Sequence, residues 1–178
     1  MRLAKMLTSD EIQISENPNI RLKKATLDDL DFINELSYNE MNPIVSRAWR
    51  GKFRWESWFK DIKEALTLES HIILLIQVKR ENIGCLWMNT ETNSLWITSI
   101  VLKREWQRRK IGSQIMAHLI NECKQDGIKT IELGVQQNNE AAMRFYTEIG
   151  FRKFDQIRSA GTDLLQLKLK DHRDLSYL

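Results

Sequence analysis

The spacing of apolar and polar residues changes period several times along the chain, and each change predicts a different element. Ile20 to Ala25 alternates as a strand does, and Thr26 then caps a helix in which Asp29 takes the third position. We expect Pro43 to interrupt the chain. A second amphipathic helix follows, and its apolar stripe, which begins at Trp55, is typical of core packing.

The middle of the chain has the pattern of a sheet. Three runs rich in β-branched and aliphatic residues are separated by short polar turns, and they cover Ile72 to Val78, Ile83 to Asn89 and Leu95 to Leu102. Short connections of this kind place antiparallel strands side by side. The pattern therefore predicts a three-stranded meander.

The C-terminal half alternates helices with strands. The predicted segments are a helix from Ile111 that stops near Gly127, a strand at Thr130 to Val135, a helix from Asn138 or Asn139 to Gly150, and strands at Phe151 to Ile157 and Asp163 to Lys170. The order β-α-α-β-β-β-α-β-α-β-β predicts a single-domain α/β (α+β) fold, a mixed, mostly antiparallel sheet of about seven strands flanked by four helices. We expect a domain over 20–170, an N-terminal extension over 1–19 and a tail over 171–178.

Composition narrows the class of protein. The 178 residues are 42% hydrophobic and carry 27 basic against 24 acidic side chains, which fits a globular protein and neither a disordered chain nor a membrane span. The N-terminus lacks the pattern of a secretory signal, so we expect a cytoplasmic protein. Cys85 and Cys123 have no metal or redox spacing and are expected to be buried apolar residues. The three histidines share no ligand spacing, and we expect no metal.

The strongest candidate for chemistry joins the end of a strand to the start of a helix. It reads Trp106-Gln-Arg-Arg-Lys-Ile-Gly-Ser113 and places three consecutive cations before the helix. Unpaired N–H groups and the helix dipole attract an anion there, and Gly112 lets a phosphate approach the main chain. From these residues alone, a nucleotide, a phosphosugar, coenzyme A or a nucleic-acid backbone all fit.

A second segment, Asn139 to Phe151, forms a capped helix that ends at a glycine, and together the two segments resemble the GNAT superfamily of N-acetyltransferases. The matching residues are Gln107, Ile111, Gly112 and Ser113 in its pyrophosphate motif and Asn139, Ala142, Phe145, Tyr146, Gly150 and Phe151 in its other motif. The resemblance covers roughly residues 20 to 170, and the element order agrees with it. Either motif alone is weak, whereas their order and spacing together are specific.

The resemblance implies a GNAT-like fold in which acetyl-CoA lies between two strands that splay apart. It implies that the cofactor is bound by Ile100, Leu102, Gln107, Arg108, Arg109, Lys110, Ile111, Gly112, Ser113 and Asn139. Backbone groups of the first two would pair with the pantetheine arm, and residues 108–113 would hold the pyrophosphate. Lys110 departs from the family, which usually has glycine there. If the position needs a positive φ, lysine strains the loop; we favour the alternative, that its ammonium simply adds attraction.

The resemblance also implies the roles of the catalytic residues. Tyr146 matches the residue that protonates the departing thiolate, and a phenol that titrates near 10 is protonated at neutral pH. Ribosomal-protein alanine acetyltransferases place a glutamate where Gly134 stands here. Glu132, two residues earlier on the same strand face, is our candidate for the general base, acting directly or through water. Glu105 and Ser99 are the alternatives, and a solvated or structural role is open for all three.

The acceptor is expected to bind between residues 38 and 58, where aromatic and acidic side chains suited to an ammonium group gather: Tyr38, Glu40, Met41, Trp49, Phe53, Trp55 and Glu56.

The leading hypothesis is an acetyl-CoA-dependent N-acetyltransferase that acts directly on a primary amine of a small molecule or peptide. A noncatalytic acyl-CoA-binding sensor or interaction module is the alternative, and a nucleic-acid-binding protein ranks last. We expect no nucleic-acid or membrane partner, and a monomer or homodimer.

Overall fold

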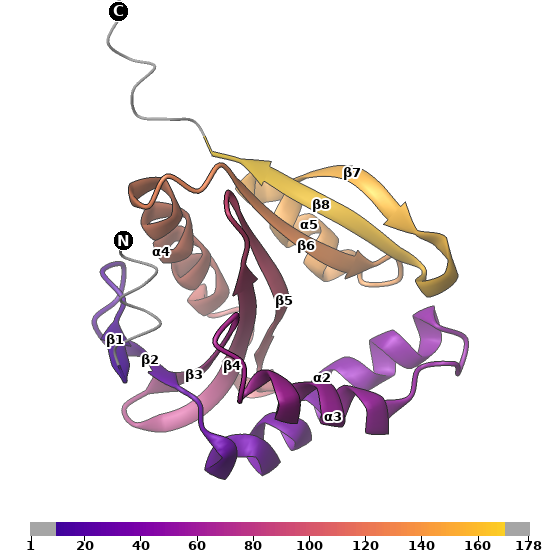
Figure 1. Ribbon diagram of the computed structural model, residues 1–178, viewed down its shortest axis with the longest axis horizontal. Helices are drawn as coiled ribbons and strands as arrows, with labels where there is room; N and C mark the ends of the chain where they lie inside the picture. The colour runs from indigo at the N-terminus through magenta and orange to yellow at the C-terminus, as the bar shows by residue number, and fades with distance from the viewer. Residues whose placement is uncertain (1–9, 170–178) are drawn as a thin grey trace, which may run out of the picture.

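The computed structural model describes residues 10–169, in which one eight-stranded sheet has the order β1-β2-β3-β4-β5-β6-β8-β7 (Figure 1). The strands are β1 Glu11–Gln13, β2 Ile20–Lys24, β3 His71–Val78, β4 Glu81–Thr90, β5 Ser94–Leu102, β6 Thr130–Gln136, β7 Arg152–Ile157 and β8 Thr162–Lys168. The helices are α2 Leu30–Ala48, α3 Trp55–Ala65, α4 Ile111–Gln125 and α5 Glu140–Ile149, with short 3-10 turns η1 Leu27–Asp29, η2 Arg104–Trp106 and η3 Arg158–Ala160. The predicted fold class, a mixed and mostly antiparallel sheet with four flanking helices, is confirmed.

The sheet begins earlier than the sequence pattern suggested. β1 lies within the expected extension 1–19 and pairs antiparallel with β2, where Glu11 faces Lys23 and Gln13 faces Arg21. Ile14, next to it, is buried. A strand of three residues with one apolar member has almost no alternation to detect, and pairing with β2 forms it instead. Residues 1–9 and the expected tail 171–178 lie outside the described residues.

The expectation that Pro43 interrupts the chain is wrong. α2 continues through it from Leu30 to Ala48, with buried residues before and after the proline, Leu36 and Val45. Proline removes one helical hydrogen bond, but its ring lies on the exposed side of α2. Packing of both halves of the helix against the sheet therefore outweighs the local cost.

Helices cover both faces of the sheet, as Figure 1 shows for α4 and α5 on one face and α2 and α3 on the other. The alternation along β3 assigns each face its own core. Leu74 and Ile76 pack in the core that contains α4, whereas Ile73 and Leu75 pack in the core that contains α2 and α3. Because both faces are covered, the strand is a continuous apolar run.

One strand pair decides the shape of the site. β5 and β6 form the parallel pair of the described sheet, and they are paired only from Ser94 to Ile97 on one side and from Thr130 to Leu133 on the other. Beyond these positions the strands separate, which is plain in Figure 1. The separation starts at a bulge, because Ser99 faces Trp87 and Ile97 faces Met88, which leaves Thr98 without a partner on β4.

No helix within residues 10–169 combines the length and the apolarity that crossing a bilayer requires.

Both cysteines are buried, as predicted, and this gives a testable pH dependence. Desolvation raises the pKa of the Cys85 thiol to about 12, and desolvation together with the carboxylates of Asp126 and Glu122 raises that of Cys123 to about 12. Above pH 9 the thiols of the unfolded chain lose their protons, whereas the buried thiols of the folded chain keep theirs up to about pH 12. The contribution of each thiol to the unfolding free energy is therefore complete below pH 9 and is lost as the pH rises toward 12. We expect neither thiol to react with Ellman's reagent at pH 8 in the native state. We also expect the unfolding free energy to fall between pH 8 and 10 by on the order of 1 kcal/mol per thiol.

Chemical denaturation at pH 8 and at pH 10, for the native chain and a C85A/C123A variant, measures the change in unfolding free energy. The variant is less stable at either pH because it loses packing, but its unfolding free energy should fall less between pH 8 and pH 10. An equal fall in both proteins would contradict the account.

Candidate functional site

A cavity of about 500 Å³ lies where the end of β5 meets the starts of α4 and α5. We call it the cradle cavity. Eight of the ten residues predicted to bind the cofactor line it: Ile100, Leu102, Gln107, Arg108, Lys110, Gly112, Ser113 and Asn139. Arg104, which the motif does not include, lines it as well. The cavity therefore joins backbone from β5 to three exposed cations and a helix N-terminus.

The N-terminus of α4 is open toward an anion. Lys110 occupies the N-cap position and makes no side-chain cap, and the first turn holds no acidic residue. Gln114 is the first residue whose N–H bonds back to the helix start, at 3.0 Å from the Lys110 carbonyl. The N–H groups of residues 111–113 are therefore the unpaired donors that every helix start leaves. α5 differs, because the Asn139 side chain accepts a hydrogen bond from the Ala142 N–H at 3.1 Å.

The loop before α4 has a strained backbone. Arg108 and Lys110 have φ values of 59° and 61°, a region that favours glycine. Our interpretation that position 110 needs no positive φ is therefore wrong. Lys110 adopts the left-handed conformation that a glycine would adopt easily, and its Cβ is accommodated in that conformation. The sequence gives no sign of this, because the motif fixes residue types and not dihedral angles.

The three consecutive cationic side chains of this loop do not point to the same place. Arg108 and Lys110 line the cradle cavity, whereas Arg109 does not. Its guanidinium lies over the Trp106 ring, 5.0 Å from the centroid, in a cation–π contact. Ile111 does not line the cavity either, because it is buried in the core.

Gln107 fastens the loop to its surroundings. Its Nε2 donates to the Leu102 carbonyl at 2.8 Å and to Glu40 Oε2 at 3.0 Å. The motif glutamine thus ties the cradle to the end of β5 and to α2. The Leu102 carbonyl already accepts the hydrogen bond from Gln107. The main-chain groups that are left for a ligand are therefore the N–H of Leu102 and the N–H and carbonyl of Ile100.

A second cavity, of about 220 Å³, lies between the separated strands β5 and β6. We call it the aromatic cavity, because it is lined by Trp49 and Phe53 from the segment that joins α2 and α3 and by Trp58 from α3. Its other walls are residues 97–101 of β5 and 133–136 of β6. The two cavities meet, since both are lined by Met41, Ile44, Ile100, Val101, Asn139, Ala142 and Tyr146.

Tyr146 is the titratable residue at the junction of the two cavities. It is 7% exposed and packs edge-on against Phe145 and Phe151, with ring centroids 5.0 and 5.4 Å away. Its hydroxyl makes no hydrogen bond to another residue of the range 10–169. Burial raises the pKa of the phenol above its usual value near 10, so the group is protonated throughout the neutral range.

The predicted base does not lie at this junction. Glu132 lines neither cavity, and its carboxylate accepts a 2.6 Å hydrogen bond from Gln166 on β8. Glu105 is exposed and lines neither cavity, whereas Ser99 lines the aromatic cavity. A Cβ at Gly134 would lie 3.0 Å from a methyl group of Thr162, so a glutamate there would require Thr162 to shift. This placement argues against Glu132 as the base.

The predicted acceptor segment is only partly brought to the site. Met41, Trp49 and Phe53 line the aromatic cavity, and Glu40 lines the cradle cavity. Tyr38 and Trp55 instead pack against each other at 5.2 Å, and neither lines a cavity of the site. Trp58 belongs to the apolar stripe that begins at Trp55 and that we expected to pack in the core. It does pack against the core, and it also lines the aromatic cavity.

No cluster of three or more His, Cys, Asp or Glu side chains in the described part of the chain is placed to hold a metal ion.

Comparison with known proteins assigns the family. The model of the acetyltransferase (GNAT) family matches residues 34–151, so the chain belongs to the GNAT acetyltransferases. It is 24% identical over 144 residues to an uncharacterized N-acetyltransferase of Methanocaldococcus jannaschii, covering 77% of this chain and 62% of that protein. It is 34% identical over 55 residues to the ribosomal protein bS18-alanine N-acetyltransferase of Salmonella typhimurium, covering 31% of this chain and 37% of that enzyme. The chain thus matches less than two thirds of either relative's length.

Solved structures share the fold. The PaiA N-acetyltransferase of Thermoplasma acidophilum, crystallised in complex with coenzyme A, superposes with a TM-score of 0.68 at 20% identity, over 84% of this chain and 98% of that one. The ribosomal-protein-S18-alanine N-acetyltransferase of Escherichia coli superposes with a TM-score of 0.67 at 16% identity, over 89% and 99%. At these identities the likeness establishes the fold.

The left-handed backbone at Lys110 predicts a stability change. Replacing it with glycine removes the steric cost of a Cβ at positive φ, and we expect the unfolding free energy to rise by about 1 kcal/mol. The matched control is K110A, which removes the same charge but keeps the Cβ. Urea denaturation should find K110G more stable than K110A; equal stabilities would show that the loop is not strained at this residue.

Proposed function

We propose that the protein transfers an acetyl group from acetyl-CoA directly to a primary amine of a small molecule or peptide. The observation that carries this proposal is the meeting of two unlike cavities at one buried phenol. The cradle cavity offers cations and unpaired N–H groups, whereas the aromatic cavity offers indole and phenyl faces. Membership in the GNAT family and the coenzyme A complex of the PaiA enzyme support the same assignment.

The chemistry of the cradle fits a diphosphate. Arg108, Lys110 and the uncapped start of α4 place positive charge on one wall of a 500 Å³ cavity. Gly112 has an ordinary φ, and a Cβ there would meet only Phe145, at 3.5 Å. The conformation of the loop therefore does not require this glycine, and room for a phosphate close to the main chain explains it.

The junction of the cavities fits the transfer step. Acetyl-CoA, when bound, supplies the activated acetyl group. Tyr146, whose pKa burial raises, holds its proton at neutral pH and would donate it to the sulfur as the carbon–sulfur bond breaks. The phenolate would then recover a proton from solvent, which takes up the proton that the amine gives up. The main chain of Ile100 and the N–H of Leu102 offer donors and an acceptor to the pantetheine arm. Aromatic side chains face the incoming amine.

One observation supports the alternative, a noncatalytic acyl-CoA-binding module. Among the described residues, no carboxylate or imidazole lines the aromatic cavity. In the catalytic proposal the amine enters in its neutral form, and its surplus proton leaves through water beside Ser99 or Gln136. In the alternative no proton needs to leave. Release of coenzyme A thiol in the presence of amines separates the two.

The cradle predicts which cations matter for binding. Coenzyme A at 100 times its Kd should stabilise the protein by roughly 2.7 kcal/mol and raise the Tm. We expect an R108Q/K110Q variant to bind coenzyme A at least tenfold more weakly by calorimetry. R109Q should change the Kd by less than threefold, because Arg109 lies over Trp106. A Tm unaffected by millimolar coenzyme A would refute the cradle, and equal losses in both variants would refute this assignment of the cations.

The phenol predicts a loss confined to turnover. Tyr146→Phe removes the proton donor but keeps the packing, so we expect kcat to fall about 100-fold while the Kd of coenzyme A changes less than threefold. Tyr38→Phe is the matched control, and we expect it to leave kcat unchanged. Glu132→Gln should lower kcat by less than threefold. A normal rate for Tyr146→Phe would remove the phenol from the mechanism, and a large loss for Glu132→Gln would restore that residue as the base.

A further inference from the structure

A third cavity, of about 500 Å³, lies at the C-terminal end of α2 and is lined by four cationic side chains, Arg47, Arg50, Lys52 and Arg158. We call it the basic cleft. Its remaining walls come from the loop after β6 and from the turn between β7 and β8, and no carboxylate lines it. The whole chain carries 27 basic and 24 acidic residues, so a cleft with four of one sign departs from its nearly balanced charge.

Within residues 10–169 these four cationic side chains are unpaired. None of them makes an ion pair or a side-chain hydrogen bond with another residue between positions 10 and 169. The C-terminus of α2 contributes only about half a negative charge against them, within its last turn. A cleft with walls of one sign focuses the field and attracts a ligand of the opposite sign.

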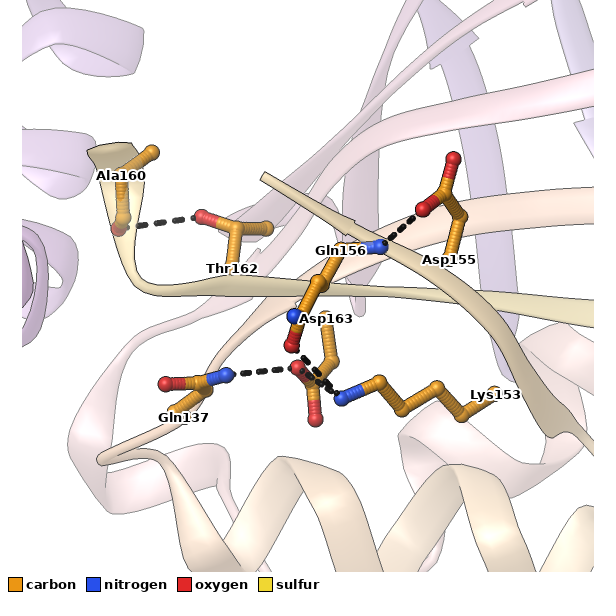
Figure 2. A network of polar contacts seen from close by, with 7 residues as sticks. All are labelled: Gln137, Lys153, Asp155, Gln156, Ala160, Thr162 and Asp163. Carbon is orange, nitrogen blue, oxygen red and sulfur yellow. Dashed lines mark hydrogen bonds and ion pairs between the residues drawn. The ribbon is translucent and has the colours of Figure 1, made fainter. Parts of the chain in front are cut away.

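The cleft is built from three segments that hydrogen bonds hold together. Asn138 Nδ2 donates to the Ile44 carbonyl at 3.1 Å, and the Gln137 N–H donates to the Gly161 carbonyl at 2.8 Å. Figure 2 shows the Gln137 amide and Lys153 converging on Asp163, at 2.8 and 2.7 Å. The carboxylate of Asp163 is thus paired with Lys153 and is not among the residues that line the cleft.

The basic cleft continues the line of the other two cavities. Trp49 lines both it and the aromatic cavity, and the aromatic cavity in turn meets the cradle cavity at Tyr146. The Trp49 indole Nε1 is buried and has no hydrogen-bond partner among the described residues. A buried donor without a partner is uncommon.

We propose that the amine acceptor carries one or more carboxylates remote from its amino group and that the basic cleft binds them. This inference rests on the proposed function, because it places the amine in the aromatic cavity. The amine then lies beside Tyr146, the acceptor extends past Trp49, and its carboxylates reach Arg50, Lys52 and Arg158. Such carboxylates come either from a peptide with acidic residues after its N-terminus or from a single acidic amino acid.

Matched acceptors test the proposal with the full chain and saturating acetyl-CoA. Three tripeptides with amidated C-termini share an N-terminal alanine and continue with two glutamates, two glutamines or two lysines, so that only the glutamate peptide carries carboxylates. Free glutamate and free glutamine form a second pair. We expect kcat/KM for the glutamate tripeptide to be at least tenfold higher than kcat/KM for the glutamine tripeptide. The lysine tripeptide should have the lowest value. The preference should shrink as salt rises. A preference shown by the tripeptides alone assigns a peptide acceptor, and one shown also by free glutamate assigns a small acid.

Variants separate the cleft from the rest of the site. R50Q/R158Q should reduce the glutamate-to-glutamine ratio to less than threefold while leaving kcat/KM for the glutamine tripeptide and the KM for acetyl-CoA unchanged. K60Q/K63Q on α3 removes the same charge from exposed positions outside the three cavities and should keep the ratio. Equal rates with all three tripeptides, or equal effects of both double variants, would overturn the proposal while leaving acetyl transfer intact.

Binding without acetyl-CoA keeps the two proposals distinguishable. Calorimetric titration should give a Kd for the glutamate tripeptide at least tenfold lower than for the glutamine tripeptide, and R50Q/R158Q should abolish the difference. Binding with this preference but no transfer to any acceptor would support the cleft and refute the transferase. Tighter binding of a short single-stranded RNA than of the glutamate tripeptide would overturn the carboxylate assignment.

Discussion

The separation of β5 from β6 is the constraint on which the site depends. Parallel pairing lasts for four positions and stops where Thr98 bulges from the β4 ladder. Each strand keeps its other neighbour, since β5 pairs with β4 as far as Leu102 and β6 pairs with β8 as far as Gln136. These two antiparallel ladders hold the arms apart while leaving main-chain groups between them unpaired. Continued pairing would fill the aromatic cavity with a hydrogen-bond ladder.

α2 runs along all three cavities and fixes their order. Glu40 and Pro43 line the cradle cavity, Val45 lines the aromatic cavity and Arg47 lines the basic cleft. Continuity of the helix through Pro43 is therefore a functional matter, because a break there would separate the binding surfaces. The arrangement places positive charge at both ends of a path whose middle is aromatic, so a donor and an acceptor that both carry anions would approach the phenol from opposite sides.

Much of the fold was predictable because its elements follow local rules. The alternation in β3 to β5, the Thr26 and Asn139 caps and the Gly127 and Gly150 stops all depend on neighbours in sequence. β1 and the unbroken α2 were not predictable, since pairing with β2 and packing around Pro43 create them.

The candidate site divides in the same way. The motifs predicted most of the cradle and the place of Tyr146. They did not predict the left-handed backbone at Arg108 and Lys110 or the stacking of Arg109 on Trp106. Nor did they predict that Glu132 lies outside both cavities of the site, hydrogen-bonded to Gln166. The basic cleft joins residues 47–52 to Arg158, about 110 positions apart in the chain, and no local pattern brings them together.

A crystal structure of the protein with coenzyme A tests the central claim most directly. The account predicts the diphosphate against the N–H groups of residues 111–113, with Arg108 and Lys110 beside it. It also predicts the sulfur between β5 and β6, within hydrogen-bond distance of the Tyr146 hydroxyl. A diphosphate bound away from the start of α4, or a sulfur directed away from that phenol, would contradict it.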